Sequence, residues 1–132
     1  MDNKDNHTHT HTLPEFGPDI PIFTKLYDFY NQLTQTINSF PKTKRYTLGQ
    51  KLDNITLDIF ELLFEIPFNN NKISTLQEIS IKIDLLKILL RSAKDNQSIT
   101  DKKYLELQTT LQEIGKMLGG WIRSTKQNLT SY

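Results

Sequence analysis

Apolar residues recur every three or four positions between residues 22 and 38. The repeating positions are Ile22, Leu26, Phe29, Leu33 and Ile37. This spacing places them on one face of a helix, because a helix makes one turn every 3.6 residues. Proline suits the first position of a helix, and the residue before a proline avoids helical backbone angles. Pro21 and the pair Phe40–Pro41 therefore bound a predicted helix at about 22–38.

Three further segments show the same helical spacing. We predict helices over about residues 43–66, 74–94 and 100–126, with Ser74 and Thr100 as N-caps of the last two. Their core faces are Leu48, Leu52, Ile55, Ile59, Leu62 and Ile66; Leu76, Ile79, Ile83, Leu86, Leu90 and Ala93; and Tyr104, Leu107, Leu111, Ile114, Leu118 and Ile122. Four helices with short connections predict an all-α, up-down-up-down four-helix bundle.

The segments 43–66 and 74–94 are apolar on two sides. The second stripes are Tyr46, Leu57, Phe60 and Phe64 on 43–66, and Ile81, Leu85 and Ile88 on 74–94. A helix that is apolar on two sides is expected to be buried on two sides. We therefore expect a homo-oligomer in which both second stripes contact neighbouring subunits. A thick core within one subunit is the alternative.

The last helical segment contains three glycines beside its apolar face. Glycine inside a helix costs roughly 1 kcal/mol relative to alanine, so three of them require a packing reason. We interpret Gly115, Gly119 and Gly120 as a place where another helix backbone approaches closely, with Leu118 in the core. Trp121, the only tryptophan, is the expected anchor of this crossing. The stretch is predicted to serve packing rather than chemistry.

A length of 132 residues fits one domain. We expect residues 1–21, which are rich in proline and histidine, to form a disordered or loosely docked arm. The bundle is then expected over 22–127, followed by a frayed end at 128–132. Neither a membrane-spanning run nor a signal-peptide core is recognisable, and there is no cysteine. These features predict a cytoplasmic protein.

The chain offers little for catalysis. Its three histidines all lie in the arm, at positions 7, 9 and 11, and cysteine is absent. The folded part therefore lacks the groups that activate a nucleophile with an imidazole. Asp58, Glu61 and Glu65 share a helical face, but no Glu-x-x-His pattern accompanies them. We predict no enzyme, no cofactor and no metal site.

Basic residues form the most suggestive polar pattern. Three cations lie at 42–45, with one more a turn later, and others follow polar faces of the third and fourth helices. These residues are Lys42, Lys44, Arg45, Lys51, Lys87, Arg91, Lys94, Lys116 and Arg123. Lysine and arginine along helices can neutralise phosphates without reading a base sequence. A solvated surface is the ordinary alternative, and the net charge is only +1.

Three stretches carry a family resemblance. They are Phe40-Pro41-Lys42-x-x-Arg45-Tyr46-Thr47-Leu48-Gly49, Leu86-x-x-Leu89-Leu90-Arg91-x-Ala93-Lys94-Asp95, and Glu113-Ile114-Gly115-x-Met117-Leu118-Gly119-Gly120-Trp121-Ile122. Together they resemble the accessory variability determinants of diversity-generating retroelements, over about residues 22–126. They are also similar to the four-helix-bundle proteins of intervening sequences in bacterial 23S ribosomal RNA genes.

The resemblance implies a barrel-shaped homopentamer without catalytic activity. It implies binding to the reverse transcriptase of the retroelement and to its template RNA and cDNA, in support of mutagenic reverse transcription. Carried over by position, Lys42, Lys44, Arg45, Arg91 and Lys94 are the first choices for these contacts. Members of the retroelement type tend to be strongly basic, whereas this chain is nearly neutral. A structural oligomer of the intervening-sequence type, with no transcriptase partner, is therefore the second hypothesis.

Overall fold

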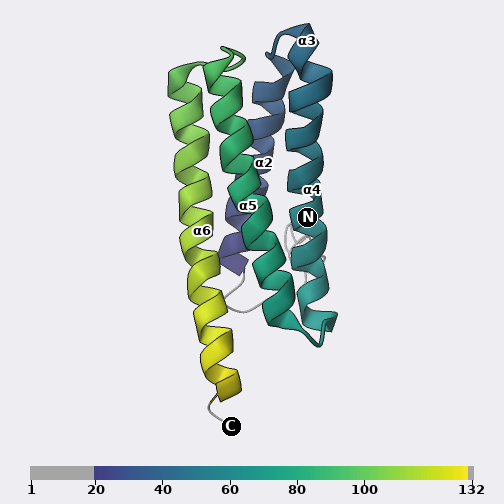
Figure 1. The fold of residues 1–132 in the computed structure, drawn as a ribbon, viewed down its shortest axis with the longest axis vertical. Coiled ribbons are helices and arrows are strands. Elements are labelled where there is room, and N and C mark those ends of the chain that lie inside the picture. Colours follow the sequence, from purple (N-terminus) through teal and green to yellow (C-terminus); the bar gives the residue numbers. More distant parts are fainter. Residues whose placement is uncertain (1–19, 131–132) are drawn as a thin grey trace, which may run out of the picture.

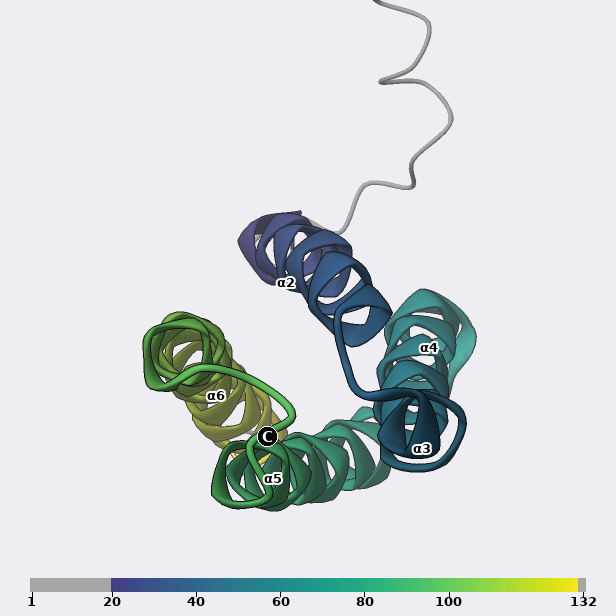
Figure 2. The ribbon, with the colours of Figure 1, turned by 90° about the horizontal axis from the view of Figure 1, so that it is seen from above.

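The computed structural model describes residues 20–130 of the chain. Within them four long helices pack as a bundle: α2 (Ile20–Asn38), α4 (Gln50–Glu65), α5 (Lys72–Asp95) and α6 (Asp101–Thr130). Seen from one end, they occupy four corners in the order α2, α4, α5, α6, so that α2 and α5 are diagonal to each other (Figure 2). The prediction of an all-α four-helix bundle is confirmed.

The core consists of the apolar stripes expected from the sequence. All five residues of the 22–38 stripe are buried, and so are the stripes of α5 and most of those of α4 and α6. Leu48, Leu62, Tyr104 and Ile122 are only partly buried and pack against this core. Leu63, which was not part of the expected stripe, is buried and belongs to the core. Burial of these faces is the main source of stability for helices of this length.

The segment 43–66 is not one uninterrupted helix. It begins with the short α3 (Lys42–Lys44), continues through a π-helical turn, η2 (Arg45–Gly49), and ends in a 3₁₀ turn, η3 (Ile66–Phe68). Gly49 explains the irregular start, because it is buried against Ile37 of α2 and leaves no room for a side chain. The wider turn lets the chain pass this contact before α4 begins.

The caps of α5 and α6 differ in how well they were predicted. α5 starts at Lys72 and is capped by Asn71, whose side-chain oxygen accepts a hydrogen bond from the Ser74 amide at 3.2 Å. The expectation that Ser74 itself is the cap is therefore wrong. Thr100 caps α6 as predicted, since its hydroxyl accepts a hydrogen bond from the Lys103 amide at 3.1 Å.

The ends of the bundle also differ from expectation. Ile20 and Pro21, which we placed in the arm, belong to α2. α6 continues to Thr130, although fraying was expected after residue 127, because no proline or glycine follows Gly120 to interrupt it. The histidine-threonine repeat of the arm lies outside the described residues. Among residues 20–130, no helix has the length and apolar character needed to cross a membrane.

The glycines of α6 do not face another helix backbone. A Cβ atom added at Gly115 would lie 3.7 Å from the Nζ atom of Lys87, and those at Gly119 and Gly120 would meet only the guanidinium of Arg123. The expected tight crossing is therefore not present between described helices of one subunit. The side chains of Lys87 and Arg123 cover the glycines instead. Trp121 is partly buried at the edge of the core.

Candidate nucleic-acid and partner interface

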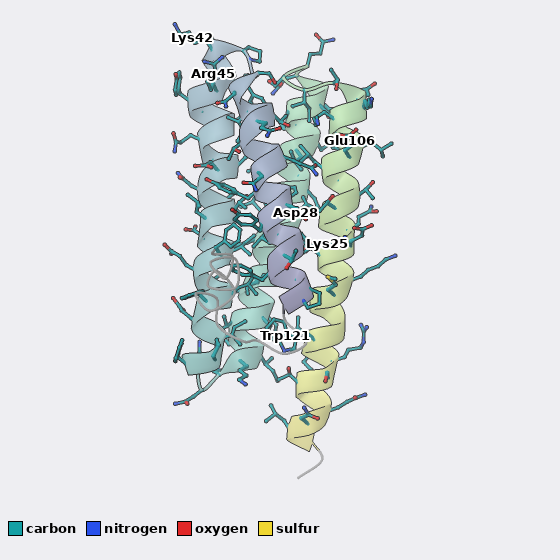
Figure 3. All side chains as sticks on the ribbon, turned by 180° about the vertical axis from the view of Figure 1, so that it is seen from behind. Lys25, Asp28, Lys42, Arg45, Glu106 and Trp121 are labelled. Carbon is teal, nitrogen blue, oxygen red and sulfur yellow. The ribbon has the colours of Figure 1, made fainter. Side chains whose placement is uncertain are left out.

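One end of the bundle gathers the cations that the resemblance selects. Lys42 and Lys44 lie in α3 and Arg45 begins η2, while Arg91 and Lys94 lie in the last turns of α5. Figure 1 shows α3 and the end of α5 at the same end of the molecule, and Figure 3 labels Lys42 and Arg45 there. The antiparallel path of the chain thus joins two basic segments that are far apart in the sequence.

These five cations differ in how well they are paired. Arg91 and Lys94 approach Asp95 at 3.6 and 4.0 Å, and the Lys94 ammonium also lies 5.4 Å from the centre of the Tyr104 ring. Lys42 and Lys44 are exposed and form no ion pair within residues 20–130. The cations of α3 are therefore the ones most available to an incoming phosphate or carboxylate.

Arg45 is held in place by the backbone. Its Nη2 atom donates a hydrogen bond to the carbonyl oxygen of Phe40 at 3.2 Å, and its guanidinium lies 6.0 Å from the centre of the Tyr46 ring. Its Nε atom is buried and has no hydrogen-bond partner among the described residues. Arg45 is therefore partly a structural residue, because the backbone uses one of its donors and another is buried.

Three of the other four predicted basic residues lie along the sides of the bundle. Lys51 is on the first turn of α4, and Lys87, near the middle of α5, approaches Asp84 at 4.0 Å. Lys116 and Arg123 lie farther along α6, and neither forms an ion pair in the described part of the chain. The structure brings the five cations selected by the resemblance to one end, with Lys51 on the adjoining first turn of α4, and leaves Lys87, Lys116 and Arg123 along the sides.

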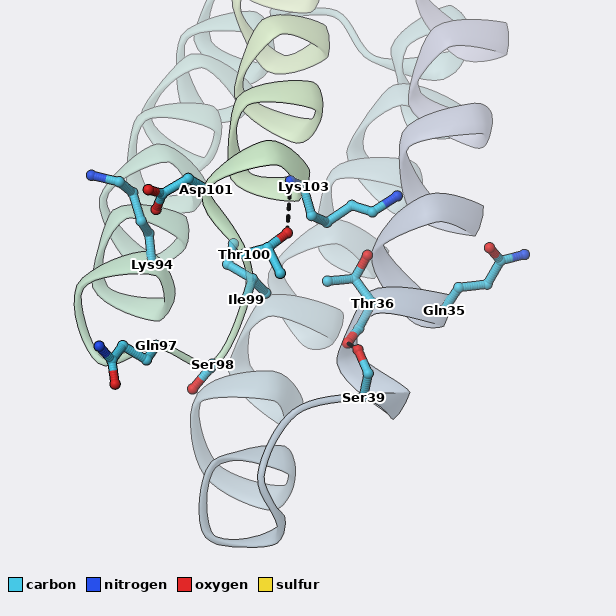
Figure 4. A pocket seen from close by; sticks show the side chains of 10 residues that line it. All are labelled: Gln35, Thr36, Ser39, Lys94, Gln97, Ser98, Ile99, Thr100, Asp101 and Lys103. Atoms are coloured by element: carbon cyan, nitrogen blue, oxygen red, sulfur yellow. Dashed lines mark hydrogen bonds between the residues drawn. The ribbon is translucent and has the colours of Figure 1, made fainter.

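A polar cavity of about 790 Å³ opens at the same end (Figure 4). Gln35 of α2 and Ser39, just after that helix, line one side, while the turn before α6 and Lys103 line the other. Figure 4 shows Lys103 extending from α6 toward α2, and its Nζ atom lies 3.0 Å from a carboxylate oxygen of Glu106. Sequence reasoning missed this group because the two walls are far apart in the sequence and no local pattern links them.

Two apolar faces lie on different sides of the bundle. The aromatic face comprises Phe23, Tyr27 and Tyr30 of α2 together with Leu57, Phe60 and Phe64 of α4 and Phe68 of η3. The aliphatic face comprises Ile81, Leu85 and Ile88 of α5. All three aliphatic residues are exposed, and Figure 2 places α5 diagonally opposite α2. The two second stripes predicted from the sequence therefore face different directions.

The aromatic face is partly buried by contacts within the subunit. The Phe60 ring packs edge-on against Phe23 and Tyr30, with ring centres 5.7 and 5.8 Å apart. Phe60 is therefore half-buried without any neighbouring subunit. Sequence reasoning missed the contribution of α2, although Phe23, Tyr27 and Tyr30 have the helical spacing of four and three that would have revealed it.

One titratable group is perturbed near this face. Partial burial raises the pKa of Tyr30 above its ordinary value, and the hydrogen bond and negative charge of Asp53 raise that pKa further. Asp58, which we weighed as part of an acidic face, lies 3.8 Å from Lys82 of α5. Within residues 20–130, no three His, Cys, Asp or Glu side chains come together as a metal ligand set would.

These features define the class: an all-α bundle with a basic end and two separate apolar faces. The chain belongs to the bAvd-like family of bacterial Avd proteins, because the model of that family matches residues 21–125. Members of this family are generally non-catalytic accessory proteins, and membership associates the chain with a retroelement. No curated protein and no solved structure matches the chain.

Proposed function

We propose that this protein is an accessory factor of a diversity-generating retroelement that binds the reverse transcriptase and its template RNA and cDNA. It has no catalytic role of its own and supports mutagenic reverse transcription by holding the two partners together. The observation that carries the proposal is the family match, which spans nearly all of the bundle. The basic end supplies a surface of the kind such a role requires.

The basic end suits contact with a nucleic-acid backbone. Lys42 and Lys44 are exposed residues of the short helix α3, which lies at one end of the bundle and is open to an approaching phosphate. A cation that neutralises a phosphate releases a counterion from the nucleic acid. An unpaired cation can do so without first breaking an ion pair within the protein. Arg91 and Lys94 extend this surface, although Asp95 lowers their contribution. Lys51, Lys87, Lys116 and Arg123 are secondary contacts in this proposal.

The two apolar faces support the proposal of a ring-shaped homopentamer. A two-fold dimer uses the same patch on both subunits, whereas a ring joins two different patches head to tail. The aromatic face and the aliphatic face are different patches on different sides of the bundle. In the proposed ring, Leu57, Phe60 and Phe64 of one subunit contact Ile81, Leu85 and Ile88 of the next, because each face then loses its contact with water.

The double variant Lys42→Glu, Lys44→Glu tests the proposed binding role. It should weaken binding of the purified reverse transcriptase or of the template RNA while the oligomer, measured by light scattering after chromatography, stays intact. Lys72→Glu is the matched control, because Lys72 is an exposed lysine in the first turn of α5 at the opposite end. Unchanged binding of both partners by the double variant would contradict the role of the basic end.

The near-neutral net charge favours a second candidate function. A structural oligomer of the intervening-sequence type needs neither a strong positive charge nor a transcriptase partner. The two candidates differ in one measurement, the mass of the complex with and without purified reverse transcriptase. A larger mass in the presence of the enzyme supports the accessory role, whereas an oligomer whose mass does not change supports the structural one.

A further inference from the structure

A second, smaller cavity lies beside the α3 cations, between α2 and the π-helical turn. Its volume is about 330 Å³. The polar side chains that line it are Thr34 and Asn38 of α2, Arg45 and Tyr46 of η2, and Gln50 and Asp53 of α4. This volume and this mixture of donors and acceptors fit a small, flat, polar ligand better than an apolar side chain.

Arg45 forms one wall of this cavity in an unusual state. Its Nη2 atom is fixed by the Phe40 carbonyl, while its buried Nε atom has no partner within residues 20–130. A buried donor without an acceptor costs free energy. An atom that water cannot reach is also closed to a ligand, so the nitrogens at the tip of the Arg45 guanidinium are the donors that a molecule in the cavity would meet. The π-helical turn that carries Arg45 is rare in proteins and is often found at functional sites.

Tyr46 supplies an exposed aromatic surface at the same place. Its side chain is 65% exposed, although an aromatic ring of this size gains from burial. The polar wall beside the ring can form further hydrogen bonds. The side-chain nitrogen of Gln50 donates to the side-chain oxygen of Asn54 at 3.3 Å, and the side-chain oxygen of Gln50 remains as an acceptor. An open ring next to hydrogen-bonding amides and a carboxylate matches the way proteins hold unpaired bases.

We propose that this cavity binds one unpaired base of single-stranded RNA, with Tyr46 as the stacking ring. Arg45 and the polar wall contact the edge of the base, and Lys42 and Lys44 neutralise the flanking phosphates. A duplex cannot use the cavity because its bases are already stacked on one another. The inference rests on the proposed RNA-binding role and adds that the protein selects single strands. It also assigns Tyr46 to RNA rather than to the predicted subunit interface.

The test compares one RNA in two forms. A short fluorescein-labelled RNA of mixed sequence is titrated with the full-length protein, alone and annealed to its complement, and binding is followed by fluorescence anisotropy. Tyr46→Ala should weaken binding of the single strand by about fivefold to a hundredfold and leave the duplex unchanged. Tyr46→Phe, which keeps the ring, should bind both forms as the natural protein does.

Two further variants separate stacking from other effects. Leu105→Ala is the control, because it removes an apolar side chain of α6 that is 64% exposed and lies outside the cavity and outside both apolar faces, and it should leave RNA binding unchanged. Lys44→Ala should weaken the single strand and the duplex alike and lower the salt dependence by about one counterion. Light scattering of Tyr46→Ala should show the same oligomer as the natural protein.

The contrary results distinguish failure of the base-binding cavity from failure of the proposed RNA-binding role. If Tyr46→Ala binds single strands normally, or loses both RNA forms equally, the cavity does not hold a base, while the proposed RNA-binding role stands. If Tyr46→Ala dissociates the oligomer, or loses the transcriptase but not RNA, the ring belongs to a protein interface. If the natural protein binds neither RNA form, both this inference and the RNA part of the proposed function fall.

Discussion

Gly49 of η2 lies so close to Ile37 of α2 that a Cβ atom added at Gly49 would stand 2.8 Å from the Cγ2 atom of Ile37. Real Cβ atoms do not approach another carbon so closely, and a buried β-branched side chain has few alternative positions. The backbone of the π-helical turn therefore rests directly on α2. This contact fixes where α4 starts and, with it, the position of Arg45 and Tyr46.

Gly49→Ala should consequently destabilise the protein. We expect the free energy of unfolding to fall by about 1–3 kcal/mol, the usual cost of forcing a methyl group into a packed site. Urea unfolding followed by circular dichroism measures the change. Gly120→Ala is the control, because its added methyl group meets only the Arg123 guanidinium, at 3.7 Å. That variant should gain up to about 1 kcal/mol from helix propensity, and equal stability of the two variants would contradict the contact.

The asparagines before α5 provide a second matched pair. Asn71 caps the helix through the Ser74 amide, whereas the exposed Asn70 has no hydrogen bond from its side chain among the described residues. Asn71→Ala should lower the free energy of unfolding by about 1 kcal/mol, and Asn70→Ala should change it by less than about 0.5 kcal/mol. Thermal and urea unfolding of both variants give the comparison. A larger loss from Asn70→Ala would show that the cap is assigned to the wrong residue.

The fold was predictable wherever the determining contacts are local. The stripe of Ile22, Leu26 and Phe29 defines α2, and Thr100 caps α6, because both effects act within two helical turns. The π-helical turn was not predictable, since it follows from the packing of Gly49 on Ile37 of another helix. The Asn71 cap was missed because three consecutive asparagines offered equivalent local chemistry.

The candidate site was only partly predictable for the same reason. The residues Lys42, Lys44 and Arg45 were visible as a local cluster, and an antiparallel bundle places them at the end where Arg91 and Lys94 also lie. The unpartnered Nε atom of Arg45 and the cavity beside it depend on how η2 packs on α2. No spacing in the sequence encodes that arrangement.

The contact between Tyr30 and Asp53 makes stability depend on pH in the alkaline range. Because burial and Asp53 raise the pKa of Tyr30, the folded state holds its phenolic proton more tightly than the unfolded state. This contribution is fully present below the ordinary tyrosine pKa of about 10 and is lost as the pH rises through the folded-state pKa. Stability should therefore fall on the alkaline side and stay unaffected by this group at neutral pH.

Titration of the Tyr30 ring by NMR, assigned with Tyr30→Phe, measures the pKa directly. Asp53→Asn removes the negative charge and should lower the pKa of Tyr30, although the part caused by burial should persist, since burial is the larger cause. Asp58→Asn is the control, because Asp58 pairs with Lys82 on the side of α4 that faces α5. An unchanged Tyr30 pKa in Asp53→Asn would contradict the proposed pairing.

The aliphatic face of α5 gives the sharpest test of the proposed ring. Ile88 is 65% exposed in the single subunit, and Leu105 of α6 is 64% exposed but lies outside the predicted interface. Ile88→Lys would bury an ammonium in the proposed contact with the aromatic face, and an unpaired buried charge strongly opposes association. Leu105→Lys adds the same charge to a surface that the ring leaves in water.

Light scattering after chromatography should therefore show a smaller species for Ile88→Lys and an unchanged oligomer for Leu105→Lys. Both variants should keep the helical circular dichroism signal and the cooperative unfolding of a folded bundle, because neither side chain is in the core. An intact oligomer in Ile88→Lys would show that the interface does not include the aliphatic face of α5. A natural protein that elutes as a monomer would instead show that the exposed apolar faces serve a different partner, since nothing within residues 20–130 of the subunit covers Ile81 or Ile88.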